Sequence, residues 1–581
     1  MTSPTQSRGR SRRRWPSVAA LVVVLAWAAV VAVVLLRVDH HVRDGVSAVN
    51  AAQGTLNAST ISDPKGPDVL APVVRAFGAA HRDLDNPLLA PLRIVPIAGR
   101  QLRAVRNLAN AAEQVGSIGE TAITSARAAL RAPHGTGPQR VAAIEALASA
   151  ASTADTRLSH VSLGSRTALI GAITRRYDDF ADRLARVRTG VHKGAIAATQ
   201  TAALLRGPSR LLLLASNNAE MRNGSGMFLS TAQVDIVNGT VKIGQVYDSG
   251  DIPLPPGVVP LSGGYASVWD AYLADQDWRN LALSARFDET AALAAKMWKA
   301  RTGTDVQGVM ALDIAGVQML LEGTGPVYAA GKDVTPSNVV QFLMHDQYLG
   351  AGVTTTRHDE LGQIAQAVVQ AVQRGGFDTA AVGKALPSTV AGRHLMLWSA
   401  DPATEAGWVS AGVSGSLADD TLLVGVQNMG ANKLDRFLTF SSDVRVDPGT
   451  VTKVTVVFHL ANGVPSGEPT YIAGSGVAGV PPNTYYALNT LTMPGAAGNV
   501  LVDGTPLANN SGVDGPTRVV AALRKIGPGA KSDMTVTFTL PGGHGRMQVE
   551  SSGRVPSATV RVQAPARDRS VGEDERPVIS W

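Results

Sequence analysis

The sequence predicts a multidomain protein with an N-terminal transmembrane helix, an all-α helical region, an α/β core domain and a C-terminal β-sandwich-like domain. Three observations support this fold class. The chain has 581 residues, more than one ordinary domain holds. A long uncharged apolar run stands near its beginning. The apolar pattern then changes twice, from helical spacing to a mixture, and finally to short strands.

The first segment predicts a membrane anchor. Residues 1–16 form a basic arm without an acid, and residues 17–36 carry no charge. A helix of that length can cross the hydrocarbon core, and its positive flank should stay in the cytoplasm. A cleaved signal peptide is the alternative, but the run is long for one and no small-residue cleavage site follows it. We therefore expect an uncleaved signal anchor, a single-pass protein of the cell membrane, and an extracytoplasmic bulk.

Composition excludes several functions. Five arginines of the basic arm account for five of the seven net positive charges, so the rest of the chain is nearly neutral and nucleic acid is not expected as a partner. Cysteine is absent, which excludes disulfides, thiol catalysis and cysteine-based metal sites. An exported chain without disulfides is compatible with a bacterial cell envelope.

The sequence predicts an extracytoplasmic helical bundle or stalk over residues 37–206. Leu102, Val105 and Leu108 illustrate its helical spacing of apolar residues. Three prolines interrupt the helices between residues 85 and 100. The charged residues of this region are interpreted as a solvated face.

Residues 207–400 predict the α/β core domain, because strand and helix patterns alternate there. The apolar run after Ser209 suits a buried strand, and Asn238-Gly239 is a strong hairpin signal. A strand is expected over 305–313, and helices over 288–302, 315–325, 335–349 and 357–375. Thr335-Pro336 should open the third of these helices.

Residues 415–562 predict the β-rich domain. Short strands separated by turn residues suggest a sandwich or two small sheets. The expected strands are 421–428, 436–447, 451–462, 485–495, 499–507, 517–523 and 533–543. Residues 563–581 are expected to form a disordered tail.

A polar stretch after the first core strand is the main candidate site. It contains Asn217, Asn218, Glu220, Arg222 and Asn223, more polar function than a turn requires. Arg222 could grip phosphate or carboxylate as a planar fork, and the amides could bind hydroxyls. The alternative is a loop that satisfies itself, with Glu220 and Arg222 paired to each other or to nearby backbone.

Other charged residues give weaker candidates. Asp248 and Asp251 could bind Mg²⁺, because hard cations prefer carboxylates, although no ligand spacing is diagnostic. Arg286 precedes a helix that Asp288 could cap. Arg357 opens another helix, where it could bind pyrophosphate or take part in capping.

The sequence resembles a known family over most of its length. The resemblance is carried by "RLLLLASNNAEMRNGSGMFLS", "DQDWRNLALSARFDETAALAAKMW" and "TDVQGVMALDIAGVQMLLEGTGPV". They resemble an actinobacterial membrane-anchored family known only as domain of unknown function 4012. That resemblance implies the anchor, the helical region, the α/β core and the β-rich end, but no activity.

The order of the core elements remotely resembles the LytR-CpsA-Psr phosphotransferases. That resemblance implies transfer of polyprenyl-pyrophosphate-linked glycopolymers to the cell wall, with arginines and Mg²⁺ on the pyrophosphate above an apolar pocket. This sequence departs from the pattern. No arginine accompanies Asp248 and Asp251, and Arg357 stands alone beside His358.

Three functions stay open. The protein could bind an envelope glycan, a polyprenyl phosphate lipid or a protein partner near Arg222. It could be the phosphotransferase, or a scaffold of an envelope complex. No nucleophile elbow and no Walker lysine is present. An apolar pocket ringed by Arg222, Arg286 and Arg357 would favour lipid phosphate, whereas arginines paired with local acids would favour a scaffold.

Overall fold

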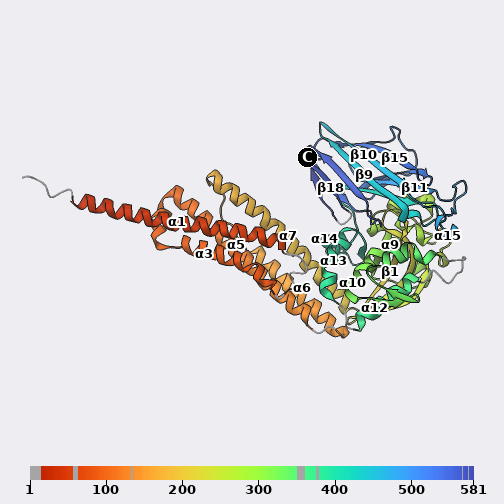
Figure 1. The fold of residues 1–581 in the computed structure, drawn as a ribbon, viewed down its shortest axis with the longest axis horizontal. Helices are drawn as coiled ribbons and strands as arrows, with labels where there is room; N and C mark the ends of the chain where they lie inside the picture. Colours follow the sequence, from red (N-terminus) through yellow and green to blue (C-terminus); the bar gives the residue numbers. More distant parts are fainter. Residues whose placement is uncertain are drawn as a thin grey trace, which may run out of the picture. The chain divides into compact units, whose positions relative to one another are not determined.

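The computed structural model divides the chain into two compact units (Figure 1). The helical unit is Met1–Arg131 with Ser149–Ala195, and the mixed unit is Ala132–Ala148 with Ile196–Trp581. The structure describes residues 15–55, 63, 65–132, 135–349, 360–374, 378–565, 567–572 and 575–581. Arg357 and His358 lie outside the described residues.

Helices account for most of the described residues up to Arg206, as the sequence predicts. They are α1 (Trp15–Thr55), α3 (Ala71–Leu84), α4 (Ala90–Ile94), α5 (Pro96–Arg131), α6 (Gly137–Ser159) and α7 (Gly171–Arg206), with the short 3-10 helices η1 (Pro67–Val69) and η2 (Pro87–Leu89). Within α1, the stretch Leu25–Gln53 is long and apolar enough to cross a membrane, a test that a signal sequence also passes. The N-terminal apolar helix is thus confirmed, and its role as an anchor stays a prediction.

The helical unit is held by small apolar clusters between α1, α3 and α5. One such cluster contains Val73, Phe77 and Ala80 of α3 together with Ala109 and Ala112 of α5. Gly45 of α1 allows this approach, since a Cβ there would lie 2.7 Å from the Phe77 ring. Alanine and glycine on the facing sides therefore let the helices come close together.

A five-stranded mixed sheet forms the centre of the mixed unit. Its strand order is β3-β2-β1-β4-β7. The strands are β1 (Ser209–Met221), β2 (Gly226–Val237), β3 (Thr240–Asp248), β4 (Gly308–Leu312) and β7 (Leu395–Ser399). β1 pairs antiparallel with β2 and parallel with β4, and β4 pairs antiparallel with β7.

Helices and turns flank this sheet. They are η3 (Ser249–Asp251), α8 (Gly263–Ser267), η4 (Asp270–Tyr272), η5 (Trp278–Leu283), α9 (Phe287–Thr302), α10 (Ile314–Thr324), α11 (Val339–Met344), η6 (Asp346–Tyr348), α12 (Glu360–Gln373), α13 (Thr379–Ala391) and α14 (Pro402–Ala411). The small hairpin β5 (Val327–Ala329) and β6 (Lys332–Val334) lies between α10 and α11 in the chain. The helix expected from Thr335 begins later, at Val339, with Asn338 as its N-cap.

The apolar run of β1 is explained by burial on both faces. Leu212 and Leu214 belong to one core, with residues of η5 and α9. Leu211 and Leu213 belong to another core, with residues of α10, α11 and α12. Because neighbouring side chains of a strand point to opposite faces, a strand covered on both sides reads as a continuous apolar run.

The hairpin predicted at Asn238-Gly239 is confirmed. Val237 pairs with Thr240, which leaves Asn238 and Gly239 as the two turn residues. Both have positive φ, 47° and 73°. In short hairpins, the two-residue turn that matches the twist of the flanking strands requires positive φ at both of its residues.

Two six-stranded sheets make up the C-terminal part. The inner sheet has the order β13-β14-β11-β8-β16-β19, and the outer sheet β12-β15-β10-β9-β17-β18. The strands are β8 (Thr421–Asn428), β9 (Leu438–Asp447), β10 (Val451–Asn462), β11 (Tyr485–Pro494), β12 (Gly498–Val502), β13 (Ser511–Asp514), β14 (Thr517–Ile526), β15 (Lys531–Pro541), β16 (Arg546–Glu550), β17 (Thr559–Ala564), β18 (Arg567–Val571) and β19 (Val578–Ser580). The short helices η7 (Leu434–Phe437) and α15 (Thr470–Ala473) lie in its connections.

One apolar core is shared by both of these sheets, as in a sandwich. Val456 and Phe538 of the outer sheet belong to the same cluster as Ala487 and Leu491 of the inner sheet. The other face of the inner sheet is also covered. Its residues Leu488, Val519 and Ala521 pack in the core that contains β1 and α9. The sandwich and the α/β sheet are therefore joined by apolar packing within one unit.

The expectation of a disordered tail over 563–581 is wrong for much of that segment. β18 pairs with β17 along the edge of the outer sheet, and β19 pairs with β16 at the edge of the inner sheet. The backbone groups of the two edges are satisfied by these added strands. The charged composition of the segment hid this, because edge strands tolerate charged side chains.

Candidate functional site

The polar stretch after Ala215 continues β1 as far as Met221, where the sequence predicted a loop, whereas Arg222 and Asn223 lie in the connection to β2. β1 extends to Met221, and a tight connection over 222–225 leads into β2 at Gly226. The pairing is irregular between Asn217 and Met221. A Cβ at Gly226 would lie 2.4 Å from the Asn217 carbonyl, so only glycine permits this close approach.

A cavity of about 460 Å³ opens beside this extended strand. Its lining comes from β1, β2, the end of β3, η5, η6 and two connections of the sandwich. The lining residues are Asn217, Glu220, Arg222, Met227, Leu229, Ser230, Asp248, Asp277, Arg279, Asn280, Gln347, Tyr348, Met429, Ala431, Lys433 and Tyr471. Four of the predicted site residues, Asn217, Glu220, Arg222 and Asp248, therefore share one cavity.

Lys433 forms the centre of one wall. Its ammonium group makes a short ion pair with the Glu220 carboxylate, and both side chains are about nine-tenths buried. It also lies 5.5 Å from the ring centre of Tyr348 and 5.2 Å from that of Tyr471. The two rings are 5.7 Å apart. Cation–π attraction and the ion pair together fix the ammonium group between the aromatic rings.

Arg222 is buried and held by the backbone. Its Nη1 donates to the carbonyls of Met221 at 3.1 Å and Asn428 at 2.5 Å. Its Nε is buried without a hydrogen-bond partner among the described residues. Burial lowers the pKa of the guanidinium, and the charge of Glu220 opposes this effect. The arrangement matches the alternative in which Arg222 is bound to nearby backbone.

Arg279 and Asp277 form the exposed side of the cavity. Their forked pair has Nε–Oδ1 and Nη2–Oδ2 distances of 2.9 and 2.7 Å. The hydrogen bond to Asp277 raises the pKa of Arg279. Arg279 is about half exposed, so this guanidinium can meet a ligand from solution.

The three asparagines of the stretch have different surroundings. The amide of Asn217 donates to the Tyr348 hydroxyl at 2.8 Å and therefore positions a wall of the cavity. Asn218 does not line the cavity; it donates to Asp313 at 2.9 Å and to the Gly553 carbonyl at 3.0 Å. Asn223 is fully buried, and neither of its amide atoms has a partner among the described residues.

Asp435 is a structural residue that the sequence did not reveal. Its carboxylate accepts hydrogen bonds from the Tyr485 hydroxyl at 2.6 Å, Arg554 at 2.8 Å, Asn428 Nδ2 at 2.9 Å and the Met221 amide at 3.0 Å. The backbone carbonyls of Met221 and Asn428 are those that hold Arg222. Asp435 thus connects β1 with strands β8 and β11 of the sandwich.

Arg286 does not line the cavity. It pairs with Asp288 at 2.6 Å, Glu289 at 3.2 Å and Asp514 at 3.7 Å. Burial and the neighbouring Asp514 raise the pKa of Glu289 to about 7. The expectation that Asp288 caps α9 is wrong, because the N-cap residue is Arg286 and Asp288 lies in the first turn.

Neither Asp248 nor Asp251 belongs to a group of three carboxylates or histidines among the described residues. Asp248 accepts from the Gly250 amide at 2.7 Å, and Asp251 is exposed and does not line the cavity. The group of three metal-type donors that the described residues form is His40, His41 and Asp44 in the helical unit.

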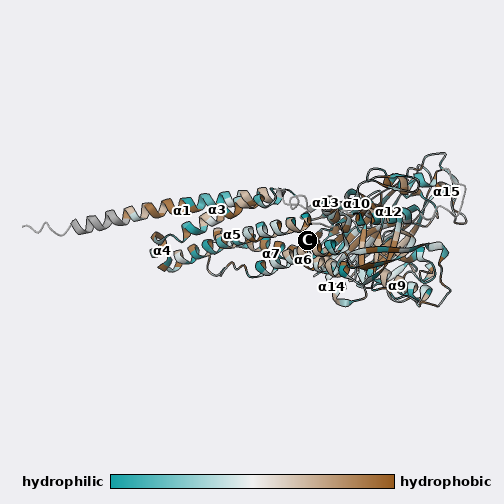
Figure 2. Ribbon diagram, turned by 90° about the horizontal axis from the view of Figure 1, so that it is seen from below, coloured by the Kyte–Doolittle hydropathy of each residue, from teal (hydrophilic) through white to brown (hydrophobic). Residues whose placement is uncertain are grey.

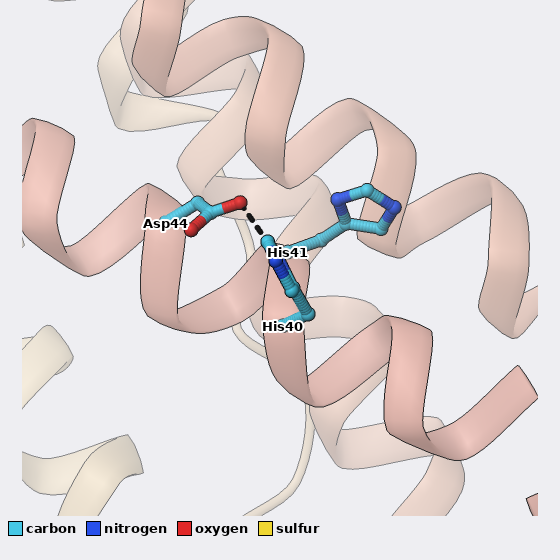
Figure 3. Close-up of side chains that lie close together, drawn as sticks. All are labelled: His40, His41 and Asp44. Carbon is cyan, nitrogen blue, oxygen red and sulfur yellow. Dashed lines mark ion pairs between the residues drawn. The ribbon is translucent and has the colours of Figure 1, made fainter. Parts of the chain in front are cut away.

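Figure 3 shows Asp44 facing His40, while the ring of His41 points another way. His40 and Asp44 lie 2.8 Å apart and are 73% and 55% exposed. His41 instead lies 3.6 Å from Asp83. These distances are those of ordinary histidine–carboxylate pairs on helix surfaces. Mg²⁺ binding by Asp248 and Asp251 stays a prediction.

Several residues of the cavity carry no signal in the sequence. Tyr348, Lys433 and Tyr471 come from three connections separated along the chain, and none belongs to a motif. Asp277 and Arg279 belong to one of the segments that carry the family resemblance, but no local pattern placed them beside Glu220. Only the packing of the sandwich against the α/β sheet brings these groups together.

Comparison with known proteins adds one finding. A family model described as a protein of unknown function (DUF4012) matches residues 206–348. This segment supplies the cavity residues from Asn217 to Tyr348, whereas Met429, Ala431, Lys433 and Tyr471 lie outside it. Neither the curated proteins nor the solved structures contain a match to this chain.

Proposed function

We propose that this chain is a single-pass membrane protein that binds a glycan in the cavity beside Lys433. The observation that carries the proposal is a cavity of about 460 Å³ whose wall combines two tyrosine rings with amide and charged side chains. Ligand sites typically have volumes of about 300–1,000 Å³. The volume therefore suits a ligand of one or a few sugar rings.

The anchor and its orientation belong to the same proposal. The basic arm would stay in the cytoplasm, α1 would cross the membrane, and the mixed unit would face the cell envelope. Support comes from the apolar stretch within α1 and from the arginines that precede it. An envelope location also brings the cavity to the compartment in which glycans are abundant.

The balance of charge in the cavity favours a neutral ligand. Glu220, Asp248 and Asp277 oppose Arg222, Arg279 and Lys433. Two of these acids are already paired with two of the bases. Pyrophosphate needs a surplus of positive charge, whereas sugar hydroxyls can donate to carboxylates and accept from guanidinium, ammonium and amide groups.

The aromatic wall supplies the remaining requirement. Sugar rings have apolar faces of C–H groups that pack on tyrosine, and Tyr348 and Tyr471 stand together at the cavity. Asn280 and Gln347 add amide groups that can bind hydroxyls. Apolar side chains in the lining are confined to Met227, Leu229, Met429 and Ala431, too few to cover a polyprenyl tail.

The second candidate is the transfer of polyprenyl-pyrophosphate-linked glycopolymers to the cell wall. Its support is that Arg222 and Asp248 line the same cavity as Arg279 and Lys433. Asp248 and Asp251 would then hold Mg²⁺, and the arginines would hold pyrophosphate. Against it, Arg286 is occupied by three carboxylates outside the cavity.

Calorimetric titration of the full chain in lipid nanodiscs distinguishes these candidates. The probes are neutral cell-wall oligosaccharides and a polyprenyl pyrophosphate with and without Mg²⁺. Arg279→Ala should weaken oligosaccharide binding about tenfold or more, because a charge-assisted hydrogen bond contributes roughly 1.5–3 kcal/mol.

Arg445→Ala is the matched control, since Arg445 forms a similar exposed pair with Asp447, at 2.9 Å, outside the cavity. Mg²⁺-dependent binding of the pyrophosphate alone would move the assignment to the second candidate. Absence of binding by either probe class would leave the scaffold role.

A further inference from the structure

The connection between α3 and α5 carries an unusual set of exposed apolar side chains. We call residues 86–99 the α3–α5 tip. Within it Leu88 is 43% exposed, Ile94 83%, Val95 47% and Ile97 73%. Arg93 is its one charged residue. Neighbouring exposed apolar residues of this kind mark a surface that another apolar phase or molecule covers.

The tip packs against the apolar stretch of α1. Leu84 and Leu89 are buried in one cluster with Val31, Val34 and Val38. The Trp27 indole nitrogen donates to the Leu88 carbonyl at 3.0 Å. In Figure 2, α4 and the start of α5 lie at the same end of the helical unit as this part of α1.

The contacted part of α1 belongs to the predicted membrane span. Trp27, Val31 and Val34 all fall within residues 17–36. An α-helix rises about 1.5 Å per residue. The tip therefore reaches several ångströms or more into the span, measured from the end of the span at Leu36. If α1 crosses a membrane, the tip therefore lies at the depth of the outer hydrocarbon layer.

A layer of charged groups marks where the tip leaves that depth. Asp83 faces His41 at 3.6 Å, and Asp85 pairs with Arg106 at 2.5 Å. Residues 86–112 contain no Asp or Glu. The same segment contains Arg93, Arg100, Arg103 and Arg106. Around the tip these four arginines outnumber Asp83 and Asp85, and an apolar segment bordered by an excess of basic residues is the pattern of protein segments seated among anionic headgroups.

The backbone of the tip is compatible with a nonpolar surrounding. Polar groups of the main chain must be paired inside the chain when water is absent. The tip is largely helical, and Pro87, Pro91 and Pro96 carry no amide proton. Asn86 caps it by accepting from the Leu88 amide at 3.0 Å, and Arg93 donates to the Leu84 carbonyl at 2.5 Å.

We propose that the α3–α5 tip inserts into the outer leaflet of the membrane beside α1, as a second membrane contact. The occupant of its apolar surface is the lipid bilayer. Continuity with the apolar stretch of α1 and the excess of arginine over acid around the tip favour lipid over a second protein. This inference rests on the proposed anchoring by α1, so the experiment must separate the two.

The absence of cysteine allows single labels to be placed without other changes. Ile94→Cys and Ile97→Cys variants of the full chain, spin-labelled in nanodiscs containing anionic lipid, report collisions with oxygen and with a water-soluble nickel chelate. Val30→Cys, 45% exposed, tests α1 itself. Ile170→Cys and Val187→Cys, 52% and 42% exposed, are matched apolar controls elsewhere in the helical unit.

The inference predicts a ratio of oxygen to nickel collisions at Ile94 and Ile97 several-fold above that of the two controls, and similar to that at Val30. A tip label as accessible to nickel as the controls, with Val30 in lipid, would overturn the inference and leave the anchor intact. A Val30 label accessible to nickel would overturn both. Tip labels shielded from both reagents would show a protein cover and equally contradict the inference.

Discussion

At the scale of single residues, the inner wall of the cavity depends on Asp435. Its carboxylate accepts hydrogen bonds from Tyr485, Arg554 and the Met221 amide. Both Arg554 and Asp435 are almost fully buried. Asp435→Asn would leave the Arg554 charge buried without its counter-ion. We expect a loss of about 3–5 kcal/mol in the free energy of unfolding by urea.

The matched control is Asp568→Asn, because Asp568 and Arg561 form an exposed pair 57% and 52% accessible. Exposed pairs contribute about 0–1 kcal/mol. Equal effects of the two substitutions would show that the Asp435 network does not support the fold.

The raised pKa of Glu289 predicts how the stability of the fold depends on pH. Its pKa in the folded protein is about 7, raised from 4.5 by burial and by Asp514. As pH rises from about 4.5 to about 7, the unfolded chain releases this proton before the folded chain does, so stability falls across that window. Glu289→Gln should flatten this fall in melting temperature measured between pH 4.5 and 8. A slope equal to that of the unchanged protein would contradict the assignment.

At the scale of elements, the sequence predicted most strands and helices but not their connections. Alternation and turn residues located β9, β10 and β15, because a strand of the outer sheet buries alternate residues. The polar stretch was misread as a loop, because its strand extension depends on the close approach at Gly226. The edge strands β18 and β19 were missed, because pairing with a preformed edge leaves no apolar pattern.

The β2–β3 hairpin gives a direct test of this level. A Cβ at Gly239 would meet the Gly137 carbonyl at 2.1 Å, in addition to its φ of 73°. Gly257 has a φ of 77° and open space around it. Gly257→Ala should cost about 1 kcal/mol from backbone strain, and Gly239→Ala clearly more, as measured by urea unfolding. Similar losses of stability for the two substitutions would show that the backbone at Gly137 moves away from the added Cβ without a cost in free energy.

At the scale of the whole molecule, the cavity is a product of two parts of the mixed unit. The segment matched by the family model supplies Glu220, Arg279 and Tyr348, and the sandwich connections supply Lys433 and Tyr471. The sequence placed Asn217, Glu220 and Arg222 together because they belong to one short stretch, but it gave no reason for Asp248 to lie beside them. It could not place the sandwich residues, since only tertiary packing brings them there.

The proposed glycan site depends on the aromatic wall of this cavity. The most direct measurement compares oligosaccharide affinity of Tyr471→Ala and Tyr486→Ala by titration of the full chain. Both tyrosines are partly exposed and lie near a lysine, Lys433 at 5.2 Å and Lys525 at 5.8 Å, but Tyr486 does not line the cavity. Binding should fall about fivefold or more in Tyr471→Ala and stay unchanged in Tyr486→Ala, since a packed aromatic ring contributes roughly 1–3 kcal/mol. Oligosaccharide binding that survives Tyr471→Ala undiminished would contradict the account.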